Sequence, residues 1–137
     1  MWVSPSIVKW TILAAALEAA VTGLVLFVWP PLFAWLVFGA EFSNAGDALG
    51  GLTAIVLLAL VLATWPSTAK TPNQLSSVRT LLIYNLLAAI YLVYVGLGGK
   101  LTGILLWPAT ALHAIFALLL GAAWFSTREI QEEDFSI

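Results

Sequence analysis

The chain has no cysteine, and its 137 residues include one methionine, Met1, and one histidine, His113. The absence of cysteine excludes disulfides, thiol redox chemistry and thiolate zinc sites. A single histidine excludes a haem held by two histidines of one chain, and the Cys-x-x-Cys-His run that attaches c-type haem is missing. The sequence therefore predicts no metal site and no cofactor.

Charge is also scarce. Only 9% of the residues are charged, 62% are hydrophobic, and the mean hydropathy is +1.03. A soluble domain carries about a quarter charged residues, so an ordinary water-solvated surface is excluded. No stripe rich in lysine and arginine is present, which leaves nucleic acid binding without electrostatic support. The expected partner is the lipid bilayer.

Four long apolar runs occupy most of the chain, at about 7–29, 45–65, 78–96 and 102–125. Each is long enough to cross roughly 30 Å of hydrocarbon as a helix. A signal peptide is the competing interpretation of the first run, but the run is too long and Glu18 lies in its middle. We expect an all-α integral membrane four-helix bundle with short loops, made of one transmembrane domain (1–125) and an acidic cytoplasmic tail (126–137).

Two features flank the start of the second run. The segment Pro30–Phe38 is apolar and aromatic but too short to span, so it is expected to lie at the outer interface or to re-enter slightly. Asn44 is followed three residues later by Asp47, which resembles a helix cap with an acid in the first turn. This capping role is the preferred interpretation of Asp47, which stays a site candidate.

The basic residues predict an orientation. Four spans place both termini on one side of the membrane, together with the loop between the second and third helices. That side carries four basic residues and the opposite side carries one, Lys100; the four are Lys9, Lys70, Arg79 and Arg128. The excess predicts that both termini are cytoplasmic.

Three uncommon polar residues, Glu18, Asn85 and His113, lie near the middle of the first, third and fourth runs. Counting about 1.5 Å per residue brings them to a similar depth. They could fasten helix to helix through hydrogen bonds. Alternatively, they could line a ligand, proton or catalytic site, because ionisable groups inside a membrane usually mark function and a Glu–His pair suits proton transfer. Tyr84 and Tyr91 could donate hydrogen bonds into the same bundle.

Helical spacing predicts that Glu18 and His113 face inward. Glu18 shares a face with small and hydroxyl side chains, and His113 lies in a four-residue stripe of small residues. The second run offers a similar stripe, and such stripes let membrane helices approach closely. The three sets are Thr11, Ala15, Glu18 and Thr22; Ala109, His113, Ala117 and Gly121; and Gly46, Gly50 and Ala54.

The run Ala19–Gly23, the Pro30–Pro31 turn and the Gly50–Gly51 pair resemble the DoxX-like family of small bacterial inner-membrane proteins. The resemblance covers the whole chain through its four-helix architecture. It implies a bacterial inner membrane location and no family site residues. Members of that family serve as subunits of quinone-linked oxidoreductases, which makes a larger membrane complex an expected partner.

Three functions follow as hypotheses. The preferred one is a non-enzymatic accessory or assembly subunit, because soluble mass, redox ligands and a phosphate-binding loop are missing from the sequence. The second is a binder or isomerase of a hydrophobic small molecule (a lipid, quinone or isoprenoid) held by Glu18, Asn85 and His113. The third is a proton-coupled transporter, which would require a homo-oligomer because four helices enclose little room. The sequence assigns no reaction.

Overall fold

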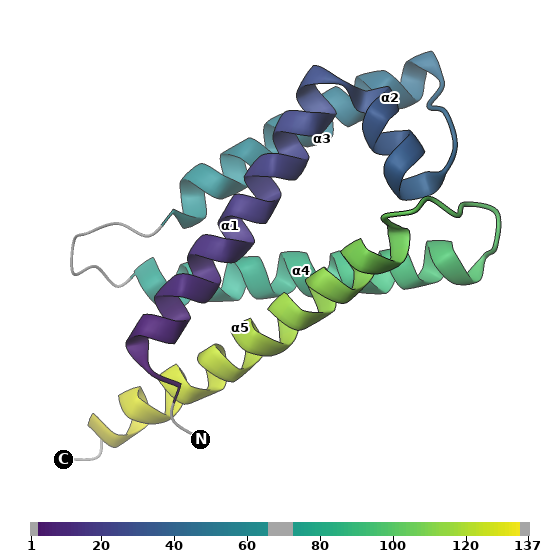
Figure 1. The fold of residues 1–137 in the computed structure, drawn as a ribbon. Coiled ribbons are helices and arrows are strands. Elements are labelled where there is room, and N and C mark those ends of the chain that lie inside the picture. Colours follow the sequence, from purple (N-terminus) through teal and green to yellow (C-terminus); the bar gives the residue numbers. More distant parts are fainter. Residues whose placement is uncertain (1–2, 66–72, 135–137) are drawn as a thin grey trace.

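The computed structural model describes residues 3–65 and 73–134, with side chains given for all of these except 73 and 127–134. The described part is all-α: α1 (Pro5–Val28), the short α2 (Pro30–Phe33), the π-helix η1 (Ala34–Phe38), α3 (Asn44–Thr64), α4 (Asn73–Leu97) and α5 (Leu106–Asp134) (Figure 1). Four of these helices, α1, α3, α4 and α5, are long and apolar enough to cross a membrane. The predicted four-helix bundle is confirmed. The loop that contains Lys70 and the last three residues of the predicted tail lie outside the described residues.

Polar caps and prolines set the limits of α1. The hydroxyl of Ser4 accepts a hydrogen bond from the amide of Ile7, and Pro5 occupies the first turn, where no backbone donor is needed. At the other end, Pro30 cannot continue the α1 hydrogen-bond ladder, so the chain breaks at Trp29. The break starts α2 in a new direction.

The beginnings of the second and fourth long helices differ from the predictions. The N-cap of α3 is Ser43, whose hydroxyl accepts from the amide of Gly46 at 3.2 Å, so the assignment of the cap to Asn44 was wrong. Asp47 does lie in the first turn, as predicted. The last long helix, α5, begins at Leu106 and not near 102, which leaves Trp107 and Pro108 in its first turn.

Residues 102–105 are not helical because their amides bond to η1. The amide of Thr102 donates to the carbonyl of Phe38 at 2.9 Å, and the amide of Leu105 donates to the carbonyl of Leu36 at 2.8 Å. Gly103 lies against the backbone of Val37, where a Cβ atom would overlap it. Gly39, with φ of 65°, ends η1 in the left-handed region. The segment after α1 is thus anchored to the loop between α4 and α5.

The helix α5 extends beyond its membrane-spanning part. The sequence becomes polar after Phe125, the predicted end of the fourth apolar run, but the helix continues to Asp134. The sequence after Gly121 contains no proline or glycine, and glutamate, glutamine and arginine favour helix. Most of the predicted acidic tail is therefore a continuation of α5.

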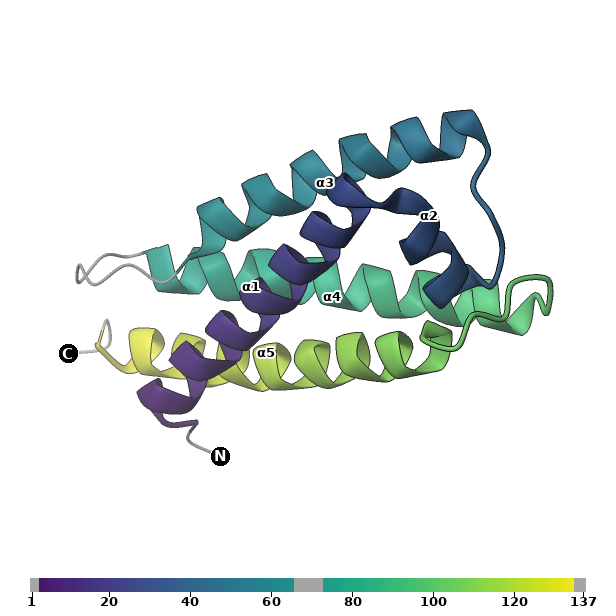
Figure 2. The same ribbon diagram turned by 45° about the horizontal axis from the view of Figure 1, so that its top comes forward.

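The long helices form two pairs, α1 with α3 and α4 with α5, which approach each other at one end and diverge toward the other (Figures 1 and 2). The approaching end, which holds the start of α1 and the end of α5, is here called the terminal end. A core of apolar side chains from α1, α4 and α5 joins the pairs there, and it includes Ile12, Leu81 and Leu120. At the diverging end, η1 lies between the pairs and packs Val37 against Leu92 and Leu106.

Candidate functional site

The three polar residues predicted at mid-depth do come together. Glu18 of α1 lies 3.8 Å from His113 of α5, measured from Oε1 to Nε2. On its other side, His113 Nδ1 lies 2.8 Å from Asn85 Oδ1 of α4. Asn85 is fully buried and His113 nearly so. These contacts link three helices in one chain of polar groups, here called the Glu–His–Asn relay.

The amide of Asn85 fixes the orientation of the histidine. Its Nδ2 donates to the backbone carbonyl of Leu81 at 2.8 Å, so its Oδ1 must be the atom that faces His113. An amide oxygen accepts only, and His113 Nδ1 is therefore the protonated nitrogen that donates to it. As a consequence, Nε2 is directed at Glu18. Asn85 acts as a positioning residue for the ring.

Glu18 is incompletely satisfied. Its Oε1 accepts a hydrogen bond from the hydroxyl of Thr22 at 2.9 Å, one turn further along α1. Its Oε2 is buried and has no hydrogen-bond partner among the described residues. The 3.8 Å between Oε1 and His113 Nε2 also exceeds hydrogen-bond distance. An unsatisfied buried polar atom costs about 1–3 kcal/mol, so this end of the relay is destabilising in the absence of a further hydrogen-bond partner.

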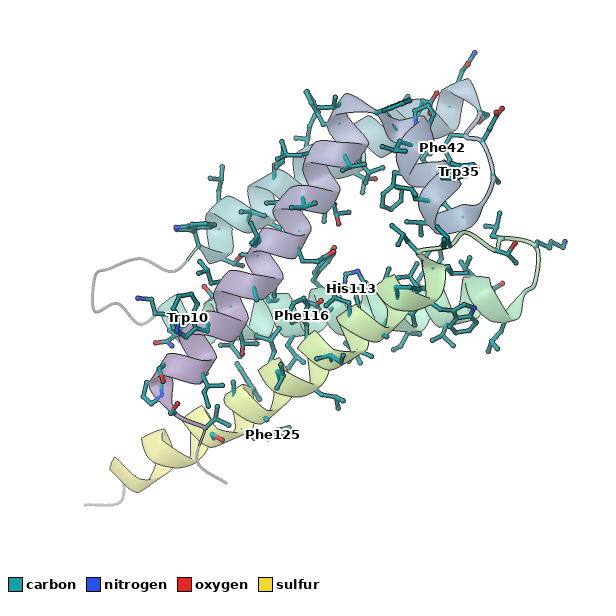
Figure 3. The ribbon with its side chains drawn as sticks, viewed as in Figure 1. Trp10, Trp35, Phe42, His113, Phe116 and Phe125 are labelled. Atoms are coloured by element: carbon teal, nitrogen blue, oxygen red, sulfur yellow. The ribbon has the colours of Figure 1, made fainter. Side chains whose placement is uncertain are left out.

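The relay borders a large cavity between the two helix pairs. The cavity has a volume of about 990 Å³, at the upper end of the range of roughly 300–1,000 Å³ that is usual for small-molecule sites. Glu18 and His113 line it, whereas Asn85 lies behind the histidine and does not. Aliphatic and aromatic side chains form most of the remaining wall, and Figure 3 shows His113 on the α5 side of the space between α1 and α5.

The wall opposite the relay comes from the segment after α1. Phe33, Leu36, Val37 and Phe38 of α2 and η1 line the cavity, and Phe42 follows them. The segment lies between the helix pairs, and its place at the outer interface or partly inside the membrane stays a prediction. No pattern in the sequence indicated that it would line a cavity. Proline at its start and Gly39 at its end are the local signals that the chain doubles back.

The cavity is open at the surface of the bundle, where several of its lining residues are exposed. Between α1 and α5, the lining residues Leu17, Val21 and Leu112 are exposed. Between α3 and α4, the lining residues Leu49 and Tyr91 are exposed. These residues belong to the segments of the four long helices that are apolar and long enough to cross a membrane.

Of the remaining predicted site residues, Tyr84 and Tyr91 line the cavity and Asp47 does not. Tyr84 lines the cavity and packs its ring edge-to-face on His113, with ring centroids 5.6 Å apart. Tyr91 also lines it but is 60% exposed, at the opening beside α3. Asp47 does not line the cavity. One of its carboxylate oxygens is buried without a hydrogen-bond partner among the described residues, and its place in the first turn of α3 agrees with the capping interpretation.

Sequence reasoning placed Thr22 on the face of Glu18 but did not identify it as the partner of the carboxylate. The four-residue spacing was the available signal, since side chains one turn apart meet on a helix. Among the described residues, no group of three or more acidic or histidine side chains is arranged to hold a metal ion.

Comparisons with known protein families, with curated proteins and with solved structures found no match for this chain.

Proposed function

We propose that this protein binds a hydrophobic small molecule within the bilayer, in the cavity between its two helix pairs. The observation that carries the proposal is the cavity of about 990 Å³, which is walled by apolar side chains and has the Glu18–His113 pair at its margin. Such a combination of apolar wall and few polar groups is typical of small-molecule sites. The class includes lipids, quinones and isoprenoids. No reaction is assigned.

The small-residue stripes favour this proposal over an accessory subunit. An accessory subunit would be expected to leave such stripes free for a partner protein. Instead Gly50 and Ala54 are buried within the chain, where Gly50 lies beside Leu26 and Pro30, and Ala117 of α5 is also buried. The accessory role, and assembly as a homo-oligomer or in a larger membrane complex, remain predictions, as does proton-coupled transport.

The location within the cell is part of the proposal. The apolar helices support contact with a lipid bilayer. The DoxX-like resemblance supports a bacterial inner membrane, and the excess of basic residues supports cytoplasmic termini. Of the basic residues whose side chains are described, Lys9 and Arg79 are exposed near the terminal end and Lys100 is exposed near the opposite one.

The proposal is tested by native mass spectrometry of protein that is gently extracted from membranes. We expect wild-type protein to retain a small apolar molecule. Ala88→Phe adds a ring to the cavity wall and should reduce the retained fraction by about tenfold or more, because the added ring occupies the space of the ligand. The same spectra would reveal a bound partner subunit.

The matched control is Ala111→Phe. Ala111 is exposed and lies outside the cavity, and helical counting from His113 places it at nearly the depth of Ala88. Retention should therefore match wild type. Wild-type protein that holds no apolar molecule, or equal loss in both variants, would contradict the proposal.

A further inference from the structure

The chemistry at the end of the relay specifies the head group of the ligand. The inference rests on the proposed function, because it concerns the same cavity. Two atoms near this end lack a hydrogen-bonding partner within the described residues: Glu18 Oε2, which is buried, and His113 Nε2, which lies 3.8 Å from Glu18 Oε1. Both side chains line the cavity, so a ligand in it lies beside the Glu18 carboxyl group and the His113 ring.

The number of protons on the pair follows from its surroundings. His113 Nδ1 keeps its proton, because it donates to Asn85 Oδ1. A net charge at this depth is costly, so Glu18 and His113 together hold one further proton. If that proton is on Glu18, the carboxyl donates and Nε2 accepts. If it is on Nε2, the imidazolium donates and the carboxylate accepts.

Both arrangements give the same result: the pair offers a ligand one donor and one acceptor. A hydroxyl group matches this, since its single oxygen can accept one hydrogen bond and donate another. An ether or a ketone oxygen only accepts, and would leave the acceptor of the pair buried and unsatisfied. Sites built to bind a hydroxyl reject analogues that lack it.

We propose that the cavity selects hydrophobic alcohols, whose hydroxyl bridges Glu18 and His113 Nε2 while the apolar body fills the space toward η1. Phe33, Val37 and Phe38 of α2 and η1 supply the apolar wall that the body contacts. A terpenoid alcohol and a diacylglycerol share this chemistry.

The test is a competition between each alcohol and its own methyl ether. Purified full-length protein is incubated with equal amounts of geranylgeraniol and geranylgeranyl methyl ether, and in a second arm with dioleoylglycerol and its methyl ether. Bound species are counted by native mass spectrometry. We expect at least about tenfold preference for the alcohol in one arm, which identifies the source of the hydroxyl.

Two substitutions separate hydrogen bonding from charge. Glu18→Gln keeps one donor and one acceptor and should retain the preference for the alcohol. Glu18→Leu removes the carboxyl group and should reduce the preference severalfold. If Glu18→Gln lost the preference as fully as Glu18→Leu, the hydroxyl bridge would be wrong, and charge would be the recognised feature.

The wild-type competition needs no variant to fold. Equal binding of alcohol and ether in both arms would overturn the hydroxyl inference and leave the proposed function intact. Binding of neither compound, by protein that also retains no apolar molecule on extraction, would overturn both.

Discussion

At the scale of single residues, Asn85 has the clearest structural role in the site. It is fully buried, donates to Leu81 and accepts from His113, so both ends of its amide are used. Polar side chains inside a membrane protein commonly fasten helices in this way. Asn85 thus links α4 to α5, which is one of the two interpretations that the sequence left open, and Glu18 lines the cavity.

Asn85→Leu should lower the free energy of unfolding by about 1–2 kcal/mol, because His113 Nδ1–H loses its acceptor in a buried place. The measurement is a denaturation titration in mixed micelles. In a double-mutant cycle with His113→Phe, we expect a coupling of about 0.6–1.7 kcal/mol, as for other membrane pairs. Additive effects of the two substitutions would contradict a direct bond.

Thr110→Val is the control for this cycle. Like Asn85→Leu, it removes a buried polar group, in this case the hydroxyl of Thr110 on α5. That hydroxyl donates to the carbonyl of Leu106 in its own helix. No interhelical partner is orphaned, so the free energy of unfolding should change by less than about 0.5 kcal/mol.

At the scale of elements, the contact between η1 and the loop before α5 closes the diverging end of the bundle. Gly103→Ala would place a methyl group against the backbone of Val37, and the loop must then shift. Its hydrogen bonds to Phe38 and Leu36 should break. We expect hydrogen exchange at the amides of Thr102 and Leu105 to accelerate, with a loss of about 1–3 kcal/mol in stability.

The comparison for this variant is Gly51→Ala, because no atom lies within 4 Å of the position of its Cβ. Gly51 lies inside α3, where alanine is the better helix former by up to about 1 kcal/mol. Exchange at Thr102 and Leu105 should be unaltered. If Gly103→Ala left both amides as protected as in wild type, the close packing of this loop would be disproved.

The elements also show where sequence reasoning succeeds and where it stops. The four long helices were predictable because the bilayer fixes their length and apolar composition. The meeting of Glu18, Asn85 and His113 was predictable because polar groups at that depth are costly unless they find partners. The role of η1 was not, since its hydrogen bonds join Phe38 to Thr102, which is distant in sequence. Helical periodicity likewise could not tell that Tyr84 faces the cavity while Asn85 faces α5.

At the scale of the whole molecule, the two helix pairs form a wedge. They meet in the apolar core at the terminal end and are separated at the other end by η1 (Figure 2). This arrangement explains how four helices can form a cavity of about 990 Å³. The exposed residues of its lining lie on the apolar segments of the long helices.

The two ends of the wedge are distinct, so the bundle has a direction. The start of α1 and the end of α5 share the terminal end, whereas the loop between α4 and α5, which contains Lys100, lies at the other (Figure 1). Because the chain has no cysteine, a single introduced cysteine reports its own side of the membrane. In spheroplasts, a membrane-impermeant maleimide should label Lys100→Cys directly and Ser4→Cys only after the membrane is opened, since basic residues favour the cytoplasm.

The reverse pattern would place the termini outside and overturn the orientation. Labelling of both positions in intact spheroplasts would contradict an odd number of spans between them. Three long helices, α1, α3 and α4, separate these positions, so opposite sides are required if each one crosses.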